Sequence, residues 1–587
     1  MMNSTTASHV AHFSWVDHTM FALMLVVSTV VGVLIGVCGK QDTKVDYLLG
    51  GKKMSVIPIA VSLIFSHISG ITIVAVPAEF YTYGAAHFNQ YLASIVTCVI
   101  NYYIFLPIFF ELQLTSTYEY LEQRFDKRVR AMASFIFALN VILYLPIVIY
   151  VPALAFNQVS GIGVHFITSV VCGVCMIYTM LGGMKAVVWT DFLQSFVTVG
   201  SCIAIIILGL VKVGGFNIMW DRSRIGGRLN FFDLNLDPFA RNTFWTCALG
   251  NIFSWMSGLC VNQGMVQKFI ALPTLKEARM SLMIFNAGFF IVKSSSLFIG
   301  LLIYSSYYEC DPITSKQVNK ADQILPFFTM DTASHLPGLP GLFIAGIFSA
   351  SLSTLSSNFN CLSATISEDF VYPWIKGKVF ENRIFHFVMK ITVIVAGLSC
   401  ILLVIVIEKM GGIIKVSSST SGVTSGALLG MFVLGMFFPW ANNKGCLAGS
   451  AASLLFMAWI IIGAQLYKTM GVERFPHLPM STEGCEEVFN ITVLEAPVPT
   501  ALPAGMGEDA FALYRISFHY YCLVGTAVTV VVGLAVSWCS GLQCARTVDS
   551  RLLVSFMKQR GHARPRGALH PSETEMLAPM ARNNYNK

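Results

Sequence analysis

The sequence predicts an all-helical polytopic membrane protein, and two observations support this fold class. The 587 residues are 55% hydrophobic and only 12% charged, which is too little charge to cover the surface of a soluble protein of this length. Apolar runs of ~20 residues, the length at which a helix crosses a bilayer, recur along almost the whole chain. Because lipid offers no partner to unpaired backbone groups, these runs have to be helices.

The apolar runs divide the chain into about thirteen expected spans. They begin near Val16, Met54, Phe88, Arg130, His165, Ala186, Asn242, Ser281, Gly338, Phe385, Gly411, Gly445 and Ile516. Basic residues cluster in the loops after the first span, before the fourth span and after the seventh span, where they include Lys268. These loops fall on one side in this count, and the positive-inside rule makes that side the cytoplasm. The N-terminus is then outside and the C-terminus inside.

We expect residues 1–542 to form one transmembrane domain and residues 543–587 to form a disordered cytoplasmic tail, because the tail is polar and contains Pro and Gly. Basic residues in the tail either approach the anionic inner leaflet or only anchor the topology. The net charge of +7 lies largely in loops and in this tail. No folded basic face is evident, so nucleic-acid binding is not expected.

Two features of the expected outer loops agree with this topology. Asn3 and Asn490 each begin a glycosylation sequon. Cys310 and Cys485 fall in the two long outer loops, where a disulfide survives, although two unpaired thiols are the alternative. The other cysteines lie mostly inside apolar runs without metal-ligand spacing, as small packing residues do.

The middle of the second span carries polar residues that a lipid-facing helix would not use. Ser66, His67, Ser69, Gly70 and Thr72 follow one another closely. Polar groups at this depth face the protein interior or a cavity, and transporters interrupt helices at such places so that freed carbonyl groups bind sodium. A packing interface of small residues is the alternative, but the histidine favours the broken helix.

The ninth span contains a second polar cluster, between residues 349 and 357. Sodium is a hard cation that prefers oxygen ligands. Ser353, Thr354 and the carbonyl group of Ala350, one helical turn earlier, would present three oxygens to one point. The alternative is that these hydroxyl groups bond only to their own backbone.

Two acidic residues have two explanations each. Asp191 stands near the start of the expected sixth span, where it is either a helix N-cap or part of an inner exit path for sodium. Glu79 in the second span is either a buried charge or a charge at a helix end.

These motifs stand in a sequence that resembles the sodium/solute symporter family from about Val16 to the last span. It is most similar to the branch that holds the sodium/iodide, sodium-coupled monocarboxylate and sodium-dependent multivitamin transporters. The resemblance rests on VPAEFYTYG at 76–84, TSTYEYLE at 115–122, GGMKAVVWTD at 182–191, VNQGMVQ at 261–267, PGLPGLF at 337–343 and LST at 352–354. It implies the LeuT-type fold, with two inverted five-helix repeats at about residues 54–213 and 242–440.

The resemblance also implies site residues, with Na⁺ as the coupling ion and no other metal or cofactor. The implied sodium ligands are the carbonyl groups of Phe65, Ile68 and Ala350 and the hydroxyl groups of Ser353 and Thr354. A second sodium would use Ser69, Thr72 and Tyr144. Trp255 would face the substrate.

The expected substrate pocket departs from each relative. His67 stands where the iodide transporter has an aromatic residue, Thr72 matches the monocarboxylate type, and Ser418 replaces a phenylalanine. The substrate-binding residues would be His67, Thr72, Tyr91, Trp255, Lys415 and Ser418. Such a pocket suits an anion with a small organic body, because a carboxylate needs positive or donor groups when it leaves water. The alternatives are that Lys415 snorkels to the surface and that His67 is a core histidine.

We therefore expect a sodium-coupled symporter that imports a monocarboxylate or a carboxylate vitamin across the plasma membrane, with Na⁺, the solute and the lipid bilayer as its partners. Iodide or another small anion is the alternative solute. A solute-gated, sodium-permeable sensor is the alternative class. An enzyme is not expected, because no nucleophile–base pair, metal-ligand spacing or phosphate-binding loop stands out.

Overall fold

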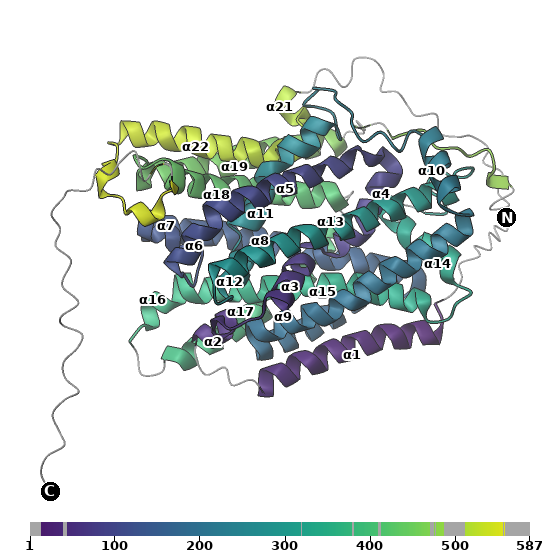
Figure 1. The fold of residues 1–587 in the computed structure, drawn as a ribbon, viewed down its shortest axis with the longest axis horizontal. Coiled ribbons are helices and arrows are strands. Elements are labelled where there is room, and N and C mark those ends of the chain that lie inside the picture. Colours follow the sequence, from purple (N-terminus) through teal and green to yellow (C-terminus); the bar gives the residue numbers. More distant parts are fainter. Residues whose placement is uncertain are drawn as a thin grey trace, which may run out of the picture.

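The computed structural model of the protein describes residues 13–38, 44–318, 320–377, 381–408, 413–469, 475, 477–486, 511–555 and 557. Every regular element in these ranges is a helix (Figure 1). The predicted all-helical class is confirmed.

The α-helices are α1 (Trp15–Cys38), α2 (Lys44–Leu49), α3 (Val56–His67), α4 (Gly70–Tyr83), α5 (Gln90–Ile100), α6 (Leu106–Leu112), α7 (Glu119–Arg124), α8 (Lys127–Ser160), α9 (Val164–Val213), α10 (Phe216–Ile225), α11 (Asn251–Cys260), α12 (Gln263–Ile270), α13 (Leu275–Ser306), α14 (Ile324–Ala333), α15 (Leu339–Ile366), α16 (Tyr372–Ile375), α17 (Glu381–Glu408), α18 (Ile413–Phe437), α19 (Asn443–Thr469), α21 (Ala512–Arg515) and α22 (Tyr521–Cys539). Shorter 3-10 or π segments are η1 (Gly50–Lys52), η2 (Ala85–Asn89), η3 (Asn101–Phe105), η4 (Thr246–Gly250), η5 (Ala321–Gln323), η6 (Ser367–Val371), η7 (Phe518–Tyr520), η8 (Ala545–Thr547) and η9 (Ser550–Leu552).

Nine helical segments of the described chain are long and apolar enough to cross a membrane, or ten if a bent pair counts as one span. The nine are Trp15–Val37, Ala85–Leu112, Lys127–Ser160, Val164–Val213, Leu275–Ser306, Leu339–Ile375, Glu381–Glu408, Asn443–Leu466 and Phe518–Cys539. The bent pair is Val45–Lys52 with Val56–His67, which meet at 120°. The protein is therefore a multi-pass membrane protein.

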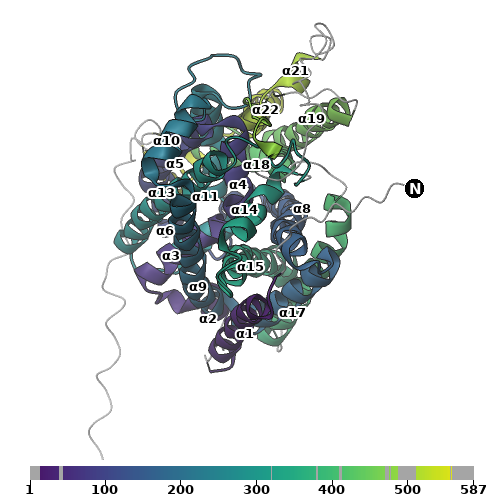
Figure 2. The same cartoon turned by 90° about the vertical axis from the view of Figure 1, so that its right-hand side faces the viewer.

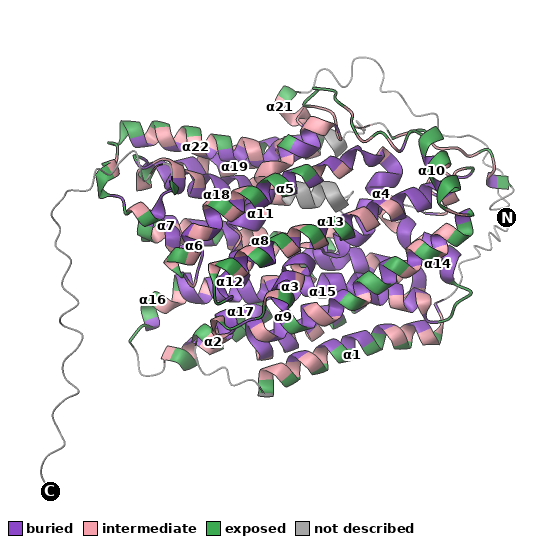
Figure 3. Cartoon of the chain, viewed as in Figure 1, coloured by how far each residue is buried: buried purple, intermediate pink, exposed green. Residues whose placement is uncertain are grey.

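The helices form one bundle with α15 at its centre (Figures 1 and 2). In the most apolar stretch around α15, 89% of the residues are buried, against 28% for α1 and 28% for α17. α15 packs on α9, α8, α1 and α17, while α18, α19 and α22 pack on one another. The exposed turns of the outer helices are apolar, with residues such as Leu34 and Leu402 facing outward (Figure 3). Lipid rather than water suits such a surface.

The predicted interruption of the second span is present, between α3 and α4. Ile68 and Ser69 have extended backbone there, with ψ values of 102° and 176°. The backbone N–H of Gly70 donates to Ser351 Oγ on α15 at 3.1 Å. A Cβ atom on Gly70 would lie 2.3 Å from that same oxygen, so glycine permits the broken helix to approach α15.

Two further helices deviate from regular geometry. α11 and α12 are separated at Val261 and Asn262, and the Asn262 side chain caps α12 by accepting from the N–H of Gly264 at 2.9 Å. α9 bends at Gly183, where φ is +53°, a value that favours glycine. The expected fifth and sixth spans are therefore two halves of one kinked helix.

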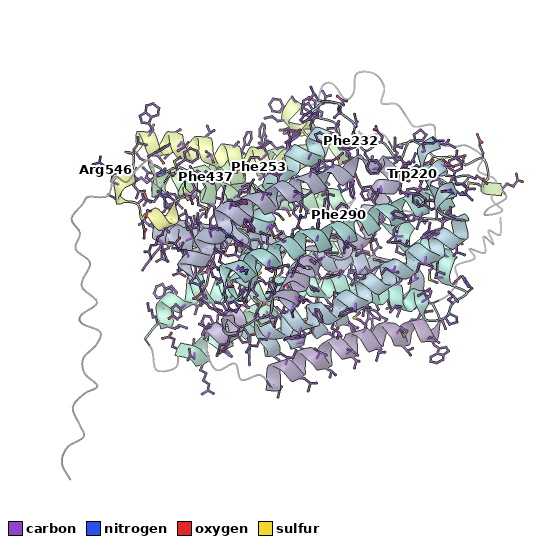
Figure 4. All side chains as sticks on the ribbon, in the orientation of Figure 1. Trp220, Phe232, Phe253, Phe290, Phe437 and Arg546 are labelled. Atoms are coloured by element: carbon purple, nitrogen blue, oxygen red, sulfur yellow. A yellow bond between two sulfur atoms is a disulfide. The ribbon has the colours of Figure 1, made fainter. Side chains whose placement is uncertain are left out.

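The two ends of the bundle differ in character. α10 and α14 lie at one end together with the start of α1, whereas α22 ends at the other (Figure 1). The exposed aromatic residues Trp220 and Phe232 lie toward the first end, and Arg546 lies at the second (Figure 4). Aromatic residues concentrate at membrane interfaces and basic residues on the cytoplasmic side.

The start of the expected tail is folded. The hydroxyl group of Tyr120 donates to the carbonyl oxygen of Leu552 at 2.8 Å, and Arg124 Nη1 donates to Gln543 Oε1 at 2.8 Å. Leu552 is buried. Packing on the bundle therefore continues past residue 542, because α7 offers partners that the local sequence does not reveal. Residues 558–587, Asn3 and Asn490 lie outside the described residues.

The structure joins Cys310 and Cys485 by a disulfide across 175 residues of sequence. We predict that Cys485→Ser lowers the free energy of unfolding by about 2–5 kcal/mol, because the disulfide restricts the unfolded chain. Thermal unfolding of the purified protein measures this loss. Cys202→Ser, at a buried free cysteine on α9, is the control, and equal stability of the two variants would contradict the prediction.

Candidate functional site

A cavity of about 300 Å³ opens between the two broken helices. Its lining mixes polar and apolar groups and comes from α3, α8, α11, α12, α15, α18, η7 and α22. The lining residues used below are Ser66, His67, Tyr144, Lys268, Ser357 and His519. Volumes of this order hold small ligands.

Several of the predicted sodium ligands converge where α3 ends against α15. Thr354 Oγ1 lies 3.5 Å from the carbonyl oxygen of Phe65, 3.3 Å from that of Ser66 and 3.2 Å from that of Ala350. The neighbouring Ser353 is buried, and its side chain interacts with that of Asp191. Several oxygen atoms that meet at one buried point fit a hard cation, which prefers oxygen ligands.

The remaining sodium candidates lie at the break itself. Ile68 is the residue between α3 and α4, and its N–H bonds to the carbonyl oxygen of Ile64 at 2.9 Å. The carbonyl oxygen of Ser69 accepts the N–H of Thr72 at 2.9 Å, and the side chains of Ser69 and Tyr144 hydrogen-bond to each other. The structure thus brings the side chains of Ser69 and Tyr144 together, and Thr72 follows in the first turn of α4.

Asp191 lies inside α9, past the kink at Gly183, and is fully buried. The N-cap explanation for Asp191 is therefore wrong, because the helix does not start there. Its Oδ2 accepts hydrogen bonds from Ser62 at 2.5 Å, from Ser66 at 3.3 Å and from Ser357 at 3.4 Å. Its carboxylate also interacts with the side chain of Ser353 on α15.

The partner of Asp191 is Lys268 on α12, with 3.5 Å between Nζ and Oδ2. Lys268 Nζ also donates to the carbonyl oxygen of Ser62 at 3.2 Å, to Ser357 Oγ at 3.0 Å and to Ser66 Oγ. Only 2% of Lys268 is exposed. Its expected place in an inner loop is wrong, because α12 is a buried half-helix rather than part of a loop.

Glu79 is a buried charge rather than a charge at an exposed helix end. Its Oε1 and Oε2 accept from Arg241 Nε at 2.7 Å and from Arg241 Nη2 at 2.8 Å. The side-chain amide of Asn242 adds a third hydrogen bond at 2.8 Å. This paired arrangement ties α4 to the segment that precedes α11.

Three of the expected substrate residues share an aromatic cluster that consists of His67, Tyr91, Trp255, Phe285 and Phe289. The rings of His67 and Trp255 lie 4.6 Å apart, and that of Phe289 lies 4.8 Å from Trp255. Tyr91 stacks on Phe289 at 5.9 Å. Of the expected substrate residues whose side chains are described, His67 lines the cavity, whereas Thr72, Tyr91 and Trp255 do not. The side chains of Lys415 and Ser418 lie outside the described part of the structure.

Lys293 on α13 is a residue that the sequence analysis missed. It is 8% exposed, and its Nζ lies 5.5 Å from the ring centre of Phe289. Among the described residues it has neither a hydrogen bond nor an ion pair, although its charge acts on the rings of His67 and His87. The available signal was a single lysine within the apolar run at 280–306, because ionisable residues at that depth mark functional sites.

The model of the sodium:solute symporter family matches residues 47–452 of this chain. The chain belongs to this family. The symporter is 37% identical to sodium-coupled monocarboxylate transporter 1 from Homo sapiens, over 89% of this chain and 87% of the relative. It is 36% identical to the sodium/iodide cotransporter from Homo sapiens, over 92% of this chain and 85% of the relative. The predicted resemblance is confirmed.

The fold of the symporter matches that of a solved Na⁺-coupled sialic acid symporter in its substrate-bound, outward-open state. The two structures give a TM-score of 0.71 at 24% sequence identity, over 90% of this chain and 99% of the other. This likeness shows that the two share a fold.

We predict that Asp191 and Lys268 in this symporter are energetically coupled. Lys268→Met alone should destabilise the protein by about 3–5 kcal/mol, because it leaves a buried carboxylate uncompensated. The double variant Asp191→Asn with Lys268→Met should lose less, because both charges are gone. Thermal unfolding measures all three variants. Lys212→Met, at the exposed ion pair with Asp331, is the control and should cost less than about 1 kcal/mol. Additive losses in the buried pair would contradict the coupling.

Proposed function

We propose that this protein is a sodium-coupled symporter that imports a small organic anion, a monocarboxylate, across the plasma membrane. The observation that carries the proposal is that two opposite kinds of site adjoin the end of α3, whose Ser66 and His67 line the cavity. Oxygen atoms converge at the break between α3 and α4, and the unpaired Lys293 lies near the aromatic cluster. A cation site next to an anion site is what coupled transport of the two requires.

The sodium ion would bind the carbonyl groups of Phe65, Ile68 and Ala350 and the hydroxyl groups of Ser353 and Thr354. All are hard oxygen ligands at a discontinuous helix, where transporters place coupling ions. The second set, Ser69, Thr72 and Tyr144, would hold another sodium. Asp191 would attract the departing ion, since its buried carboxylate lies beside Ser353, one of the proposed ligands.

The carboxylate of the solute would pair with Lys293, and its organic body would lie against His67, Tyr91 and Trp255. A buried ammonium group needs a counter-charge, and a small carboxylate supplies one together with hydrogen-bond acceptors. Monocarboxylate transporters among the relatives support this solute class. The iodide relative supports a halide as the second candidate solute. An aromatic cluster, however, offers more apolar contact to an organic anion than to a halide ion. Lys415 and Ser418 stay predictions, as does a role of Thr72 in substrate binding.

We further propose thirteen crossings with the N-terminus outside and the C-terminus inside. The nine counted segments become ten when α9 is divided at its kink. The broken helices α3–α4 and α11–α12 and the helix α18 add three more crossings. An odd number places the termini on opposite sides, as α1 and α22 suggest. The breaks after α3 and after α11 stand at corresponding places in repeats at 54–213 and 242–440, as an inverted LeuT-type repeat requires. Glycosylation of Asn3 and Asn490 on the outer side belongs to the same proposal.

Uptake by cells that express the full chain tests this function. Labelled lactate, nicotinate, biotin, pantothenate and iodide are each offered in sodium medium and in choline medium. Sodium-dependent accumulation of a carboxylate supports the proposal. Accumulation of iodide alone would contradict the proposed carboxylate and identify iodide as the solute. Sodium currents without accumulation of any solute would point to the sensor class. The family consists of transporters, so we expect no enzymatic turnover.

A further inference from the structure

Three potential metal ligands meet on one side of the cavity, outside the sites described above. They are His87 in η2, Cys247 in η4 and His519 in η7, and all three are buried. One ligand atom from each lies within 4.8 Å of the others. Cys247 Sγ is 3.8 Å from His519 Nε2, and the two imidazole rings are 5.9 Å apart.

The hydrogen bonds around this cluster show what a metal ion would replace. His87 Nε2 lies 2.6 Å from Gln90 Nε2, and the His87 ring also interacts with the side chain of Asn242. His519 Nδ1 lies 2.8 Å from the side-chain amide of Asn251. The atom of Asn251 that faces Nδ1 is its amide nitrogen, which also donates to the carbonyl oxygen of Cys247 at 3.2 Å. A metal ion at Nε2 would therefore move the ring proton to Nδ1 and turn the Asn251 amide so that its oxygen accepts that proton. Such partners on the second ring nitrogen orient metal-bound histidines in general.

A fourth ligand atom is also in place. Asn242 Oδ1 lies 3.2 Å from His519 Nε2 and 3.7 Å from Cys247 Sγ. Two imidazoles, one thiolate and one oxygen form a set that binds Zn²⁺ with four ligands. The soft sulfur ligand excludes the hard coupling ion from this site, because Na⁺ prefers oxygen.

The charges around the cluster nearly cancel. Glu79 and Arg241 both act electrostatically on His87, Cys247 and His519, and they form an ion pair with each other. The positive charge of Lys293 acts on His87 and disfavours the binding of a cation to the cluster. Loss of the Cys247 proton when a metal binds would add the negative charge that compensates it.

We propose that His87, Cys247 and His519, with Asn242, form a binding site for a thiophilic divalent cation, with Zn²⁺ as the best fit. The ion has a path, because His519 and Asn251 line the cavity. The ligands come from three segments far apart in the sequence, at the starts of α5, α11 and α22. A bound ion therefore cross-links these three segments.

Metal binding to the full-length protein, purified in detergent with reduced thiols, tests the proposal. The probes are Zn²⁺, measured as bound metal per chain, and Co²⁺, whose bond to a thiolate gives a near-ultraviolet charge-transfer band. The wild-type protein should bind one equivalent and show the band. Cys247→Ser should abolish the band, and His87→Gln and His519→Gln should each weaken Zn²⁺ binding by more than about tenfold, the effect that even an outer-shell change reaches.

The matched control is Cys522→Ser, since Cys522 is also buried and lines the same cavity but does not belong to the cluster. This variant should keep both the band and the affinity. Absence of the Co²⁺ band in the wild-type protein would overturn the proposal, whatever the variants do. A band that survives Cys247→Ser and disappears in Cys522→Ser would overturn it as well. Variants are compared only when they elute as the wild-type protein does in size-exclusion chromatography.

Discussion

Replacement of Ser353 and Thr354 together by alanine should raise the sodium concentration for half-maximal uptake on the order of 100-fold. Each hydroxyl group lost from a charged ligand costs about 1.5 kcal/mol or more, and every 1.4 kcal/mol is about tenfold in affinity. The geometry supports this size of effect, because Thr354 Oγ1 lies within 3.5 Å of three carbonyl oxygens. Sodium titration of uptake at saturating solute is the measurement.

Ser363→Ala is the matched control for this double variant. Ser363 is buried on the same helix, but its hydroxyl group donates to the carbonyl oxygen of Asn360 at 2.8 Å rather than to the convergence point. Its sodium dependence should equal that of the wild-type protein. Unchanged sodium dependence in a double variant that reaches the cell surface would remove these two residues from the sodium site.

Replacement of Lys293 by methionine should raise the solute KM by at least about 30-fold. Truncation of one partner of a buried, hydrogen-bonded charge pair costs about 2–5 kcal/mol, and the solute carboxylate would be left in an apolar site. Lys293→Arg should retain part of the affinity, because the positive charge remains. The charge of Lys293 is unpaired among the described residues. We therefore expect Lys293→Met to destabilise the solute-free protein less than Lys268→Met does.

A neutral analogue separates a role in binding from a role in folding. In the wild-type protein, the amide of the transported carboxylate should fail to compete for uptake, whereas an excess of the carboxylate should compete fully. Lys293→Met should lose this discrimination. Lys212→Met, whose lysine pairs with Asp331 near the surface, controls for general effects of a lost lysine. Wild-type discrimination retained in Lys293→Met would contradict carboxylate recognition by Lys293.

Local sequence was informative where the chemistry of the bilayer acts on each segment separately. Apolar runs have to be helices in lipid, so composition was enough for the fold class. The polar run around His67 and Ser69 predicted the broken helix for the same reason, since polar groups at that depth need an interior place. Ser353 and Thr354 were predicted as sodium ligands because their spacing with Ala350 is a single helical turn.

Tertiary structure decided which charges meet. Asp191 and Lys268 are 77 residues apart in the sequence, and the kink at Gly183 together with the break before α12 brings them together. The same separation in sequence hid the meeting of His87, Cys247 and His519.

Only burial, which depends on all the neighbouring helices at once, turned Lys268 and Lys293 from ordinary basic residues into internal charges. The sequence by itself determined a helical membrane protein with an oxygen-rich break in one span. The tertiary structure decided which distant groups share that interior, because long-range packing brings together side chains that no local pattern connects.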